Sequence, residues 1–143
     1  MTFINITKKN ISSENLCCAI SDRKFLEKYG FQTADMIGEE YILSAMSFDG
    51  TIPHFTENAK TGMVQSQDLT IYYGMQCPYI SDCVKQVENY CAGNQIPLQL
   101  IRVDTLEKAK AVPGVFNNWA VFYRGRFETV HLLNEGYLKK NLK

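Results

Sequence analysis

The chain has 143 residues, of which 45% are hydrophobic and 21% charged, a balance that suits one compact domain or one domain with a smaller attachment. Fifteen basic and fifteen acidic side chains cancel, so the net charge gives no reason to expect a nucleic acid or an anionic membrane as partner. The N-terminal sequence does not resemble a signal peptide, no apolar run reaches transmembrane length, and five irregularly spaced cysteines suit reduced thiols in a cytoplasmic protein.

The first half of the chain carries few regular patterns. Residues 25–31 (FLEKYGF) predict a short helix that ends at a glycine, and residues 40–48 predict a strand. Residues 51–67 contain proline, glycine and many small polar residues, which is typical of a connector. We therefore place a domain boundary after residue 67, with one domain over 1–67 and a second over 68–143.

Strand and helix patterns alternate from Asp68 onward. The expected elements are a strand over 68–73, a helix from about 79 to 92, a strand over 98–103, a short helix from 104 to about 112, two strands over 119–123 and 126–131 joined by a tight turn, and a final helix from near 134. Gly93 is expected to cap the first of these helices, and Asp104 with Glu107 forms a capping-box signature at the second. The order β-α-β-α-β-β-α predicts an α/β fold with a mixed sheet and matches the thioredoxin fold.

Cys77 stands between the predicted strand over 68–73 and the helix that follows, and Pro78 comes directly after it. Pro78 suits the first helical turn, where a missing N–H costs nothing. The sulfur is then expected near the helix N-terminus, where the helix dipole and unpaired N–H groups favour a thiolate. Thioredoxin-like proteins keep their reactive thiol at this place. Cys77 is therefore our candidate catalytic residue, and we expect it to be the most reactive of the five cysteines.

The second thiol of a dithiol oxidoreductase is absent. Such an enzyme needs a cysteine three residues after the first, and that residue is Ile80. Cys83 lies roughly 9 Å further along the helix axis, beyond the Cα separation of about 7 Å that a disulfide allows, and it falls on the apolar face of the helix. Cys77 is thus either a reactive or ligand-binding thiol, or a cysteine without a chemical role.

Metal ligation has little support in the sequence. His54 and His131 belong to no spaced ligand motif, and neighbouring side chains such as Cys17 and Cys18 point to opposite faces of a strand. We expect neither a native metal site nor a bound cofactor.

Two stretches resemble known families. FLEKYGF is similar to a signature near the end of GNAT-family acetyltransferases. Residues 68–143, with YYGMQCPY and VFYRGRFET, resemble the YoaP-like C-terminal domain, a thioredoxin-like domain found behind a GNAT domain.

This resemblance implies that residues 1–67 are a truncated GNAT remnant. Residues 10–24 look like the opening of such fusion proteins, yet FLEKYGF, which belongs near the end of the GNAT domain, begins at the next residue. The family's acetyl-CoA loop holds the pyrophosphate on backbone N–H groups between closely spaced glycines. None of the nine glycines here lie close enough to form that loop, which argues against acetyltransferase activity.

The resemblance also suggests residues around the thiol. Redox-active thioredoxins place a cis-proline before the first strand of the hairpin, opposite the active cysteine. Alignment of the hairpin puts Asn117 near that position, and Pro113 lies about one helical turn too early. The candidate ligand-binding residues around Cys77 are Pro78, Tyr79, Asn117 and Trp119.

Three functions stay open. The first, our main hypothesis, is a non-catalytic thioredoxin-like binding or interaction module with an unknown protein or small-molecule ligand. The second is a monothiol redox or thiol-modification activity at Cys77, and the third is residual acyl transfer through assembly with another chain. We also expect a homodimer with contacts mainly from residues 1–67, because the strand over 40–48 is expected to leave unpaired edges and an uncovered apolar face.

Overall fold

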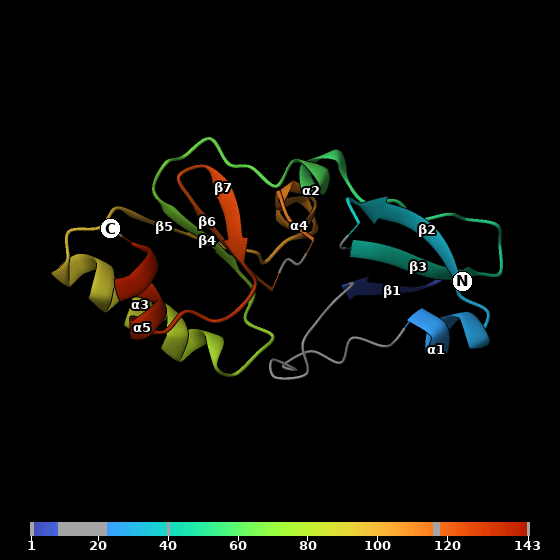
Figure 1. Ribbon diagram of the computed structural model, residues 1–143, viewed down its shortest axis with the longest axis horizontal. Coiled ribbons are helices and arrows are strands. Elements are labelled where there is room, and N and C mark those ends of the chain that lie inside the picture. Colours follow the sequence, from blue (N-terminus) through green and yellow to red (C-terminus); the bar gives the residue numbers. More distant parts are fainter. Residues whose placement is uncertain (1, 9–22, 40, 116–117, 143) are drawn as a thin grey trace. The chain divides into compact units, whose positions relative to one another are not determined.

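A computed structural model describes residues 2–8, 23–39, 41–115 and 118–142 (Figure 1). The chain divides into two compact units, Met1–Thr56 and Glu57–Lys143. Both units contain helices and strands, as expected of an α/β protein.

The first unit is built on a three-stranded sheet in the order β1-β3-β2. Its elements are β1 (Thr2–Lys8), α1 (Arg23–Lys28), β2 (Gln32–Ile37) and β3 (Tyr41–Ser47). The helix and β3 were expected, whereas β1 and β2 were not. Our expectation that the strand over 40–48 has unpaired edges is wrong, because β3 is the central strand and pairs antiparallel with both neighbours.

The second unit contains a four-stranded mixed sheet in the order β5-β4-β6-β7. Its strands are β4 (Leu69–Tyr73), β5 (Leu98–Arg102), β6 (Trp119–Tyr123) and β7 (Arg126–Thr129). β4 and β5 are parallel, while β6 is antiparallel to both β4 and β7. All four strands were expected from the sequence, although β7 ends before His131.

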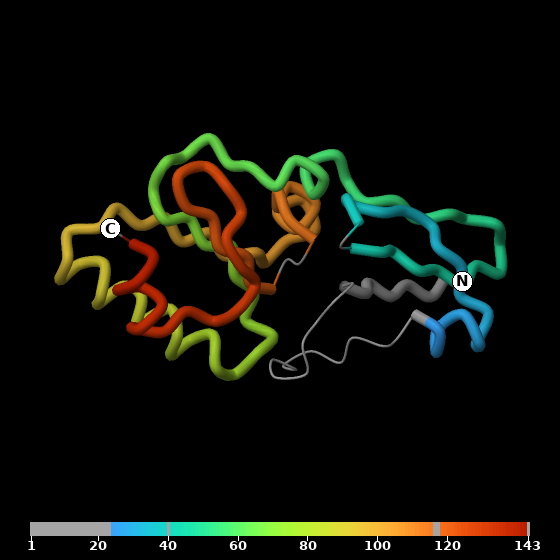
Figure 2. Tube along the Cα trace, in the orientation of Figure 1, coloured from blue at the N-terminus to red at the C-terminus, as the bar shows by residue number. Residues whose placement is uncertain are grey.

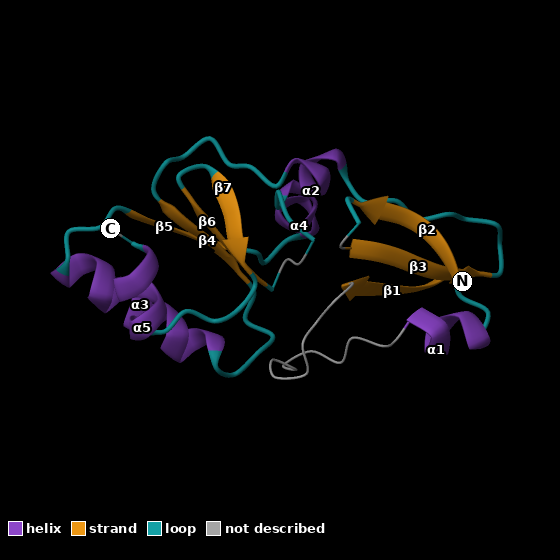
Figure 3. Ribbon diagram, viewed as in Figure 1, coloured by secondary structure: helices purple, strands orange, loops and turns teal. Residues whose placement is uncertain are grey.

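The second unit also contains helices. They are α2 (Glu57–Thr61), α3 (Ile80–Gly93), α4 (Leu106–Ala111) and α5 (Glu135–Asn141). α3 and α5 lie together on one face (Figure 3), over a core that includes Ile71, Ile80, Val87, Trp119, Val121 and Leu138. A smaller cluster of Val112, Ala120 and Phe122 fills the other face. None of the helices in the described residues is long and apolar enough to cross a membrane.

Two helix ends differ from the predicted ones by one residue. α3 continues through Gly93, and its C-cap is Asn94. The N-cap of α4 is Thr105, whose side chain accepts a hydrogen bond from the Lys108 N–H at 3.2 Å. Asp104 was expected in that role, but its carboxylate lies 2.6 Å from Lys108 Nζ. The threonine hydroxyl is adjacent to the first helical turn and satisfies its free N–H group.

Candidate functional site

The loop of residues 74–79, which we call the Cys77 loop, joins β4 to α3. Because β4 and β5 are parallel, this loop leaves the sheet at their carboxyl ends, where open α/β sheets bind ligands. The Gly74 N–H donates a hydrogen bond of 2.9 Å to the Asn118 carbonyl oxygen. This bond places the Cys77 loop beside the segment that enters β6.

The start of α3 differs slightly from the prediction. The helix begins at Ile80, with Tyr79 as its N-cap residue, and Pro78 lies in the turn before the helix, not in its first turn. The reason is a tight turn in which the Ile80 N–H donates to the Cys77 carbonyl oxygen at 3.2 Å. Cys77 packs partly buried against the core, while the side chains of Met75 and Tyr79 are 48% and 68% exposed.

No other described thiol lies in a position to work with Cys77. Ile80, at the place of a second active-site cysteine, is 1% exposed and belongs to the core. The Cys83 thiol is buried on α3 and donates to the Leu133 carbonyl oxygen at 3.3 Å. Burial raises the pKa of Cys83 and of Cys91, so both thiols are held neutral. Among the cysteines that the structure describes, Cys77 is therefore the least buried.

The candidate ligand-binding residues separate into two groups. Pro78 and Tyr79 are exposed on the Cys77 loop. Trp119 pairs with Tyr73 at the end of β4, but its side chain is only 2% exposed, and its indole N–H donates to the His131 carbonyl oxygen at 2.9 Å. The ring of Trp119 is thus part of the core, and only its main chain borders the loop. Asn117 lies outside the described residues.

The described residues contain no group of three histidine, cysteine or acidic side chains that could hold a metal ion. His54 lies in the first unit, with its Nδ1 3.8 Å from Asp35 Oδ2. His131 is an exposed residue of the second unit. Cys17 and Cys18 lie outside the described residues.

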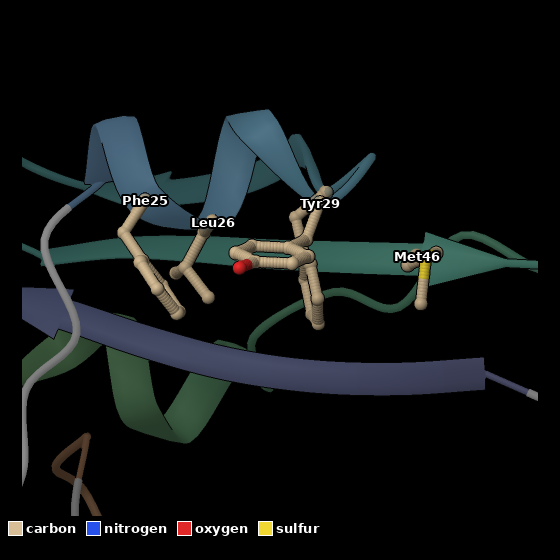
Figure 4. Close-up of a pocket in the computed structure, with 5 residues that line it drawn as sticks. Phe25, Leu26, Tyr29 and Met46 are labelled. Carbon is tan, nitrogen blue, oxygen red and sulfur yellow. The ribbon is translucent and has the colours of Figure 1, made fainter.

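A separate apolar hollow, which we did not expect from the sequence, lies in the first unit between α1 and β3 (Figure 4). Its volume is about 340 Å³, and it is lined by Phe25, Leu26, Tyr29, Phe31 and Met46. Phe25 and Tyr29 are one helical turn apart, and their ring centroids are 4.7 Å from each other. The lining offers burial to an apolar group, and none of these five described residues is a carboxylic acid, a basic residue or a thiol.

Comparison with known proteins points first to the second unit. Residues 97–140 match the family model described as YoaP-like. The chain is similar to YoaP-like proteins. The YoaP-like match begins just before β5 and ends within α5, so it covers less than half of the chain and leaves the Cys77 loop outside.

A longer similarity extends over both units. The chain is 26% identical over 125 residues to a curated protein of Bacillus subtilis (strain 168) named "Uncharacterized N-acetyltransferase YoaP". The matched region covers 86% of this chain and 50% of the relative, so the chain spans about half the length of that relative. No solved structure matches the chain. These similarities support the expected relation to YoaP-like and N-acetyltransferase-related proteins, and they carry no finer assignment.

Proposed function

We propose that residues 68–143 form a non-catalytic thioredoxin-like module that binds a protein or small-molecule partner through the Cys77 loop. The main observation behind this proposal is that residue 80 is an isoleucine. An aliphatic side chain, 1% exposed and packed in the core, stands where a dithiol enzyme needs its second cysteine. A thiol at Cys77 can therefore contact or be modified by a partner, but no other cysteine among the described residues is placed to complete an intramolecular disulfide cycle with it.

The topology of the second unit supports the thioredoxin-like assignment. A parallel β4-α3-β5 unit is followed by α4, an antiparallel β6–β7 hairpin and α5. The hairpin joins the sheet beside β4, which gives the order β5-β4-β6-β7. The functional thiol of thioredoxin-like proteins follows the first strand, as Cys77 follows β4.

The exposed side chains of the Cys77 loop support a binding role. Met75 and Tyr79 flank the thiol and leave much of their apolar surface in solvent. Methionine and tyrosine are enriched in protein interfaces, because a flexible thioether and a rigid ring with a polar tip both contact a partner well. The loop thus exposes side chains that can contact a partner, and it lacks the second thiol needed for dithiol chemistry.

A disulfide-exchange assay separates this module from the monothiol alternative. We expect the wild-type chain and Cys77→Ser to reduce a disulfide-linked substrate protein equally slowly, since Ile80 stands at the position of the resolving thiol. Ile80→Cys creates the missing Cys-x-x-Cys pair and is expected to raise the rate clearly above both. A wild-type rate that exceeds that of Cys77→Ser would instead assign monothiol redox activity to Cys77.

We further propose that residues 1–67 are the remnant of a GNAT domain that does not bind acetyl-CoA. The relative named N-acetyltransferase is about twice as long as the matched region, and this chain has no closely spaced glycines to hold a pyrophosphate. We expect calorimetry with acetyl-CoA to give no saturable heat, with an active GNAT enzyme as positive control. A micromolar dissociation constant would favour the third hypothesis, an acyl-transfer site assembled across chains.

Self-association through residues 1–67 is also part of the proposal. With β3 in the centre, β1 and β2 are the outer strands of the described sheet, and Phe25 and Tyr29 on α1 are more than half exposed. Strand edges and apolar surface of this kind are commonly covered by a second copy. Sedimentation of the full chain is expected to give the mass of a dimer, and a monomer at high micromolar concentration would contradict it.

A further inference from the structure

Residues 62–67, which we call the strap, run along the β6–β7 hairpin within the second unit (Figure 2). Three backbone hydrogen bonds hold the strap: Val64 N–H to Gly125 O at 3.0 Å, Phe127 N–H to Gly62 O at 3.0 Å and Arg124 N–H to Gln67 O at 3.2 Å. Met63 lies opposite Arg126 in an antiparallel bridge. The strap therefore occupies the outer edge of β7 as a short additional strand does.

The strap lies close to this edge, but none of its residues is fully buried. A Cβ atom on Gly125 would lie 3.1 Å from both the Val64 carbonyl oxygen and Gln67 Nε2, which is closer than most real Cβ contacts, so the hairpin and the strap leave little room for a side chain there. Val64 packs partly buried against the small core cluster around Phe122, while Met63 is 61% exposed. An element with so little burial opens locally more readily than the strands of the core.

The outer edge of β7, which the strap covers, is complementary to the same edge of a second β7 strand. The Phe127 N–H points outward from the sheet, because it donates to the strap, and the carbonyl of the same residue points the same way. Two β7 strands paired antiparallel about Phe127 would exchange both of these hydrogen bonds. In that register, the exposed Arg126 of each strand lies opposite the exposed Glu128 of the other, a stabilising cross-strand pair.

We propose that the β7 edge is a docking surface for a second copy of this chain, and that the strap occupies this surface within one chain. Opening of the strap frees the Phe127 N–H and the Gly125 carbonyl. The β7 strands of two copies then pair antiparallel, with Arg126 opposite Glu128. This contact joins second units and is separate from the dimer proposed for residues 1–67.

The first test compares full-length variants by sedimentation velocity. Val64→Pro removes the N–H that donates to Gly125, and we expect it to double the assembled mass relative to the wild-type chain. Val64→Ala keeps this N–H and is expected to retain the wild-type mass. Val64→Glu, a second way to release the strap, places a carboxylate in the same partly buried apolar site and is expected to act like Val64→Pro. The fluorescence of Trp119, the one tryptophan of the sequence, reports whether each variant is folded.

The second test addresses the register. Arg126→Glu in the Val64→Pro background sets like charges opposite Glu128 of the second copy and is expected to return the mass to the wild-type value. Adding Glu128→Arg restores opposite charges and is expected to restore the doubled mass. If folded Val64→Pro or Val64→Glu chains keep the wild-type mass, the docking surface is refuted. If the doubled mass of Val64→Pro persists after Arg126→Glu is added, the proposed register is refuted.

Discussion

Limiting iodoacetamide will alkylate Cys77 at neutral pH at least roughly 10-fold faster than Cys83 or Cys91. Cys77 lies on an exposed loop, whereas the other two side chains are 6% and 2% exposed on the inner face of α3. Burial raises the pKa of both buried thiols, so they carry little thiolate and need local opening before they meet the reagent. Peptide mass mapping after short exposure measures each cysteine separately, including Cys17 and Cys18.

Two controls accompany this labelling experiment. In denaturant, the three thiols are expected to react at similar rates, because burial then no longer protects Cys83 and Cys91. In the folded chain, the rates of the two buried thiols are expected to rise only above the ordinary thiol range of about pH 8.5. Equal labelling of Cys77 and Cys83 at neutral pH would mean that the Cys77 loop is not exposed as described, and the monothiol alternative would fall as well.

Gly125→Ala will destabilise the second unit by about 3 kcal/mol. Gly125 has φ +80°, a conformation that an alanine adopts only with strain, and its new methyl group would lie 3.1 Å from the Val64 carbonyl oxygen. Gly62→Ala is a matched control from the strap, because Gly62 has φ +60° and nothing within 4 Å of the added carbon. We expect this control to lose only the conformational part, about 1 kcal/mol.

Denaturant unfolding followed by Trp119 fluorescence measures both glycine variants in the same unit. The difference between them isolates the contact of the hairpin with the strap. If Gly125→Ala lowers the free energy of unfolding no more than Gly62→Ala does, the strap and the hairpin are not in close contact at Gly125. This result would also weaken the proposed role of the strap.

The second unit was largely predictable because its signals are local. In β4, Leu69 is followed only by β-branched and aromatic residues, and α3 buries Cys83, Val87 and Cys91 at helical spacing. The Arg124–Gly125 pair adopts positive φ at both residues, as a two-residue hairpin turn requires. Small errors at the ends of α3 and α4 arise because neighbouring residues compete for the same cap.

The first unit was less predictable because β1 and β2 are recognised as strands only by their pairing with β3. β2 has the sequence QTADMI, in which no residue is fully buried and the alternation of polar and apolar residues covers only Thr33 to Met36. β1 precedes β3 by about 40 residues, and β2 shifts register between Thr33 and Asp35. Only pairing with the buried β3 identifies these outer segments as strands.

For the candidate site, the sequence by itself determined that Cys77 lies between a strand and a helix and that Ile80 replaces a second thiol. Both facts depend on residues a few positions apart. Only the tertiary structure decided that the ring of Trp119 belongs to the core, that β3 is a central strand and that residues 62–67 line the β7 edge. These features depend on burial and backbone pairing between segments distant in the chain, and backbone hydrogen bonds leave little trace in side-chain composition.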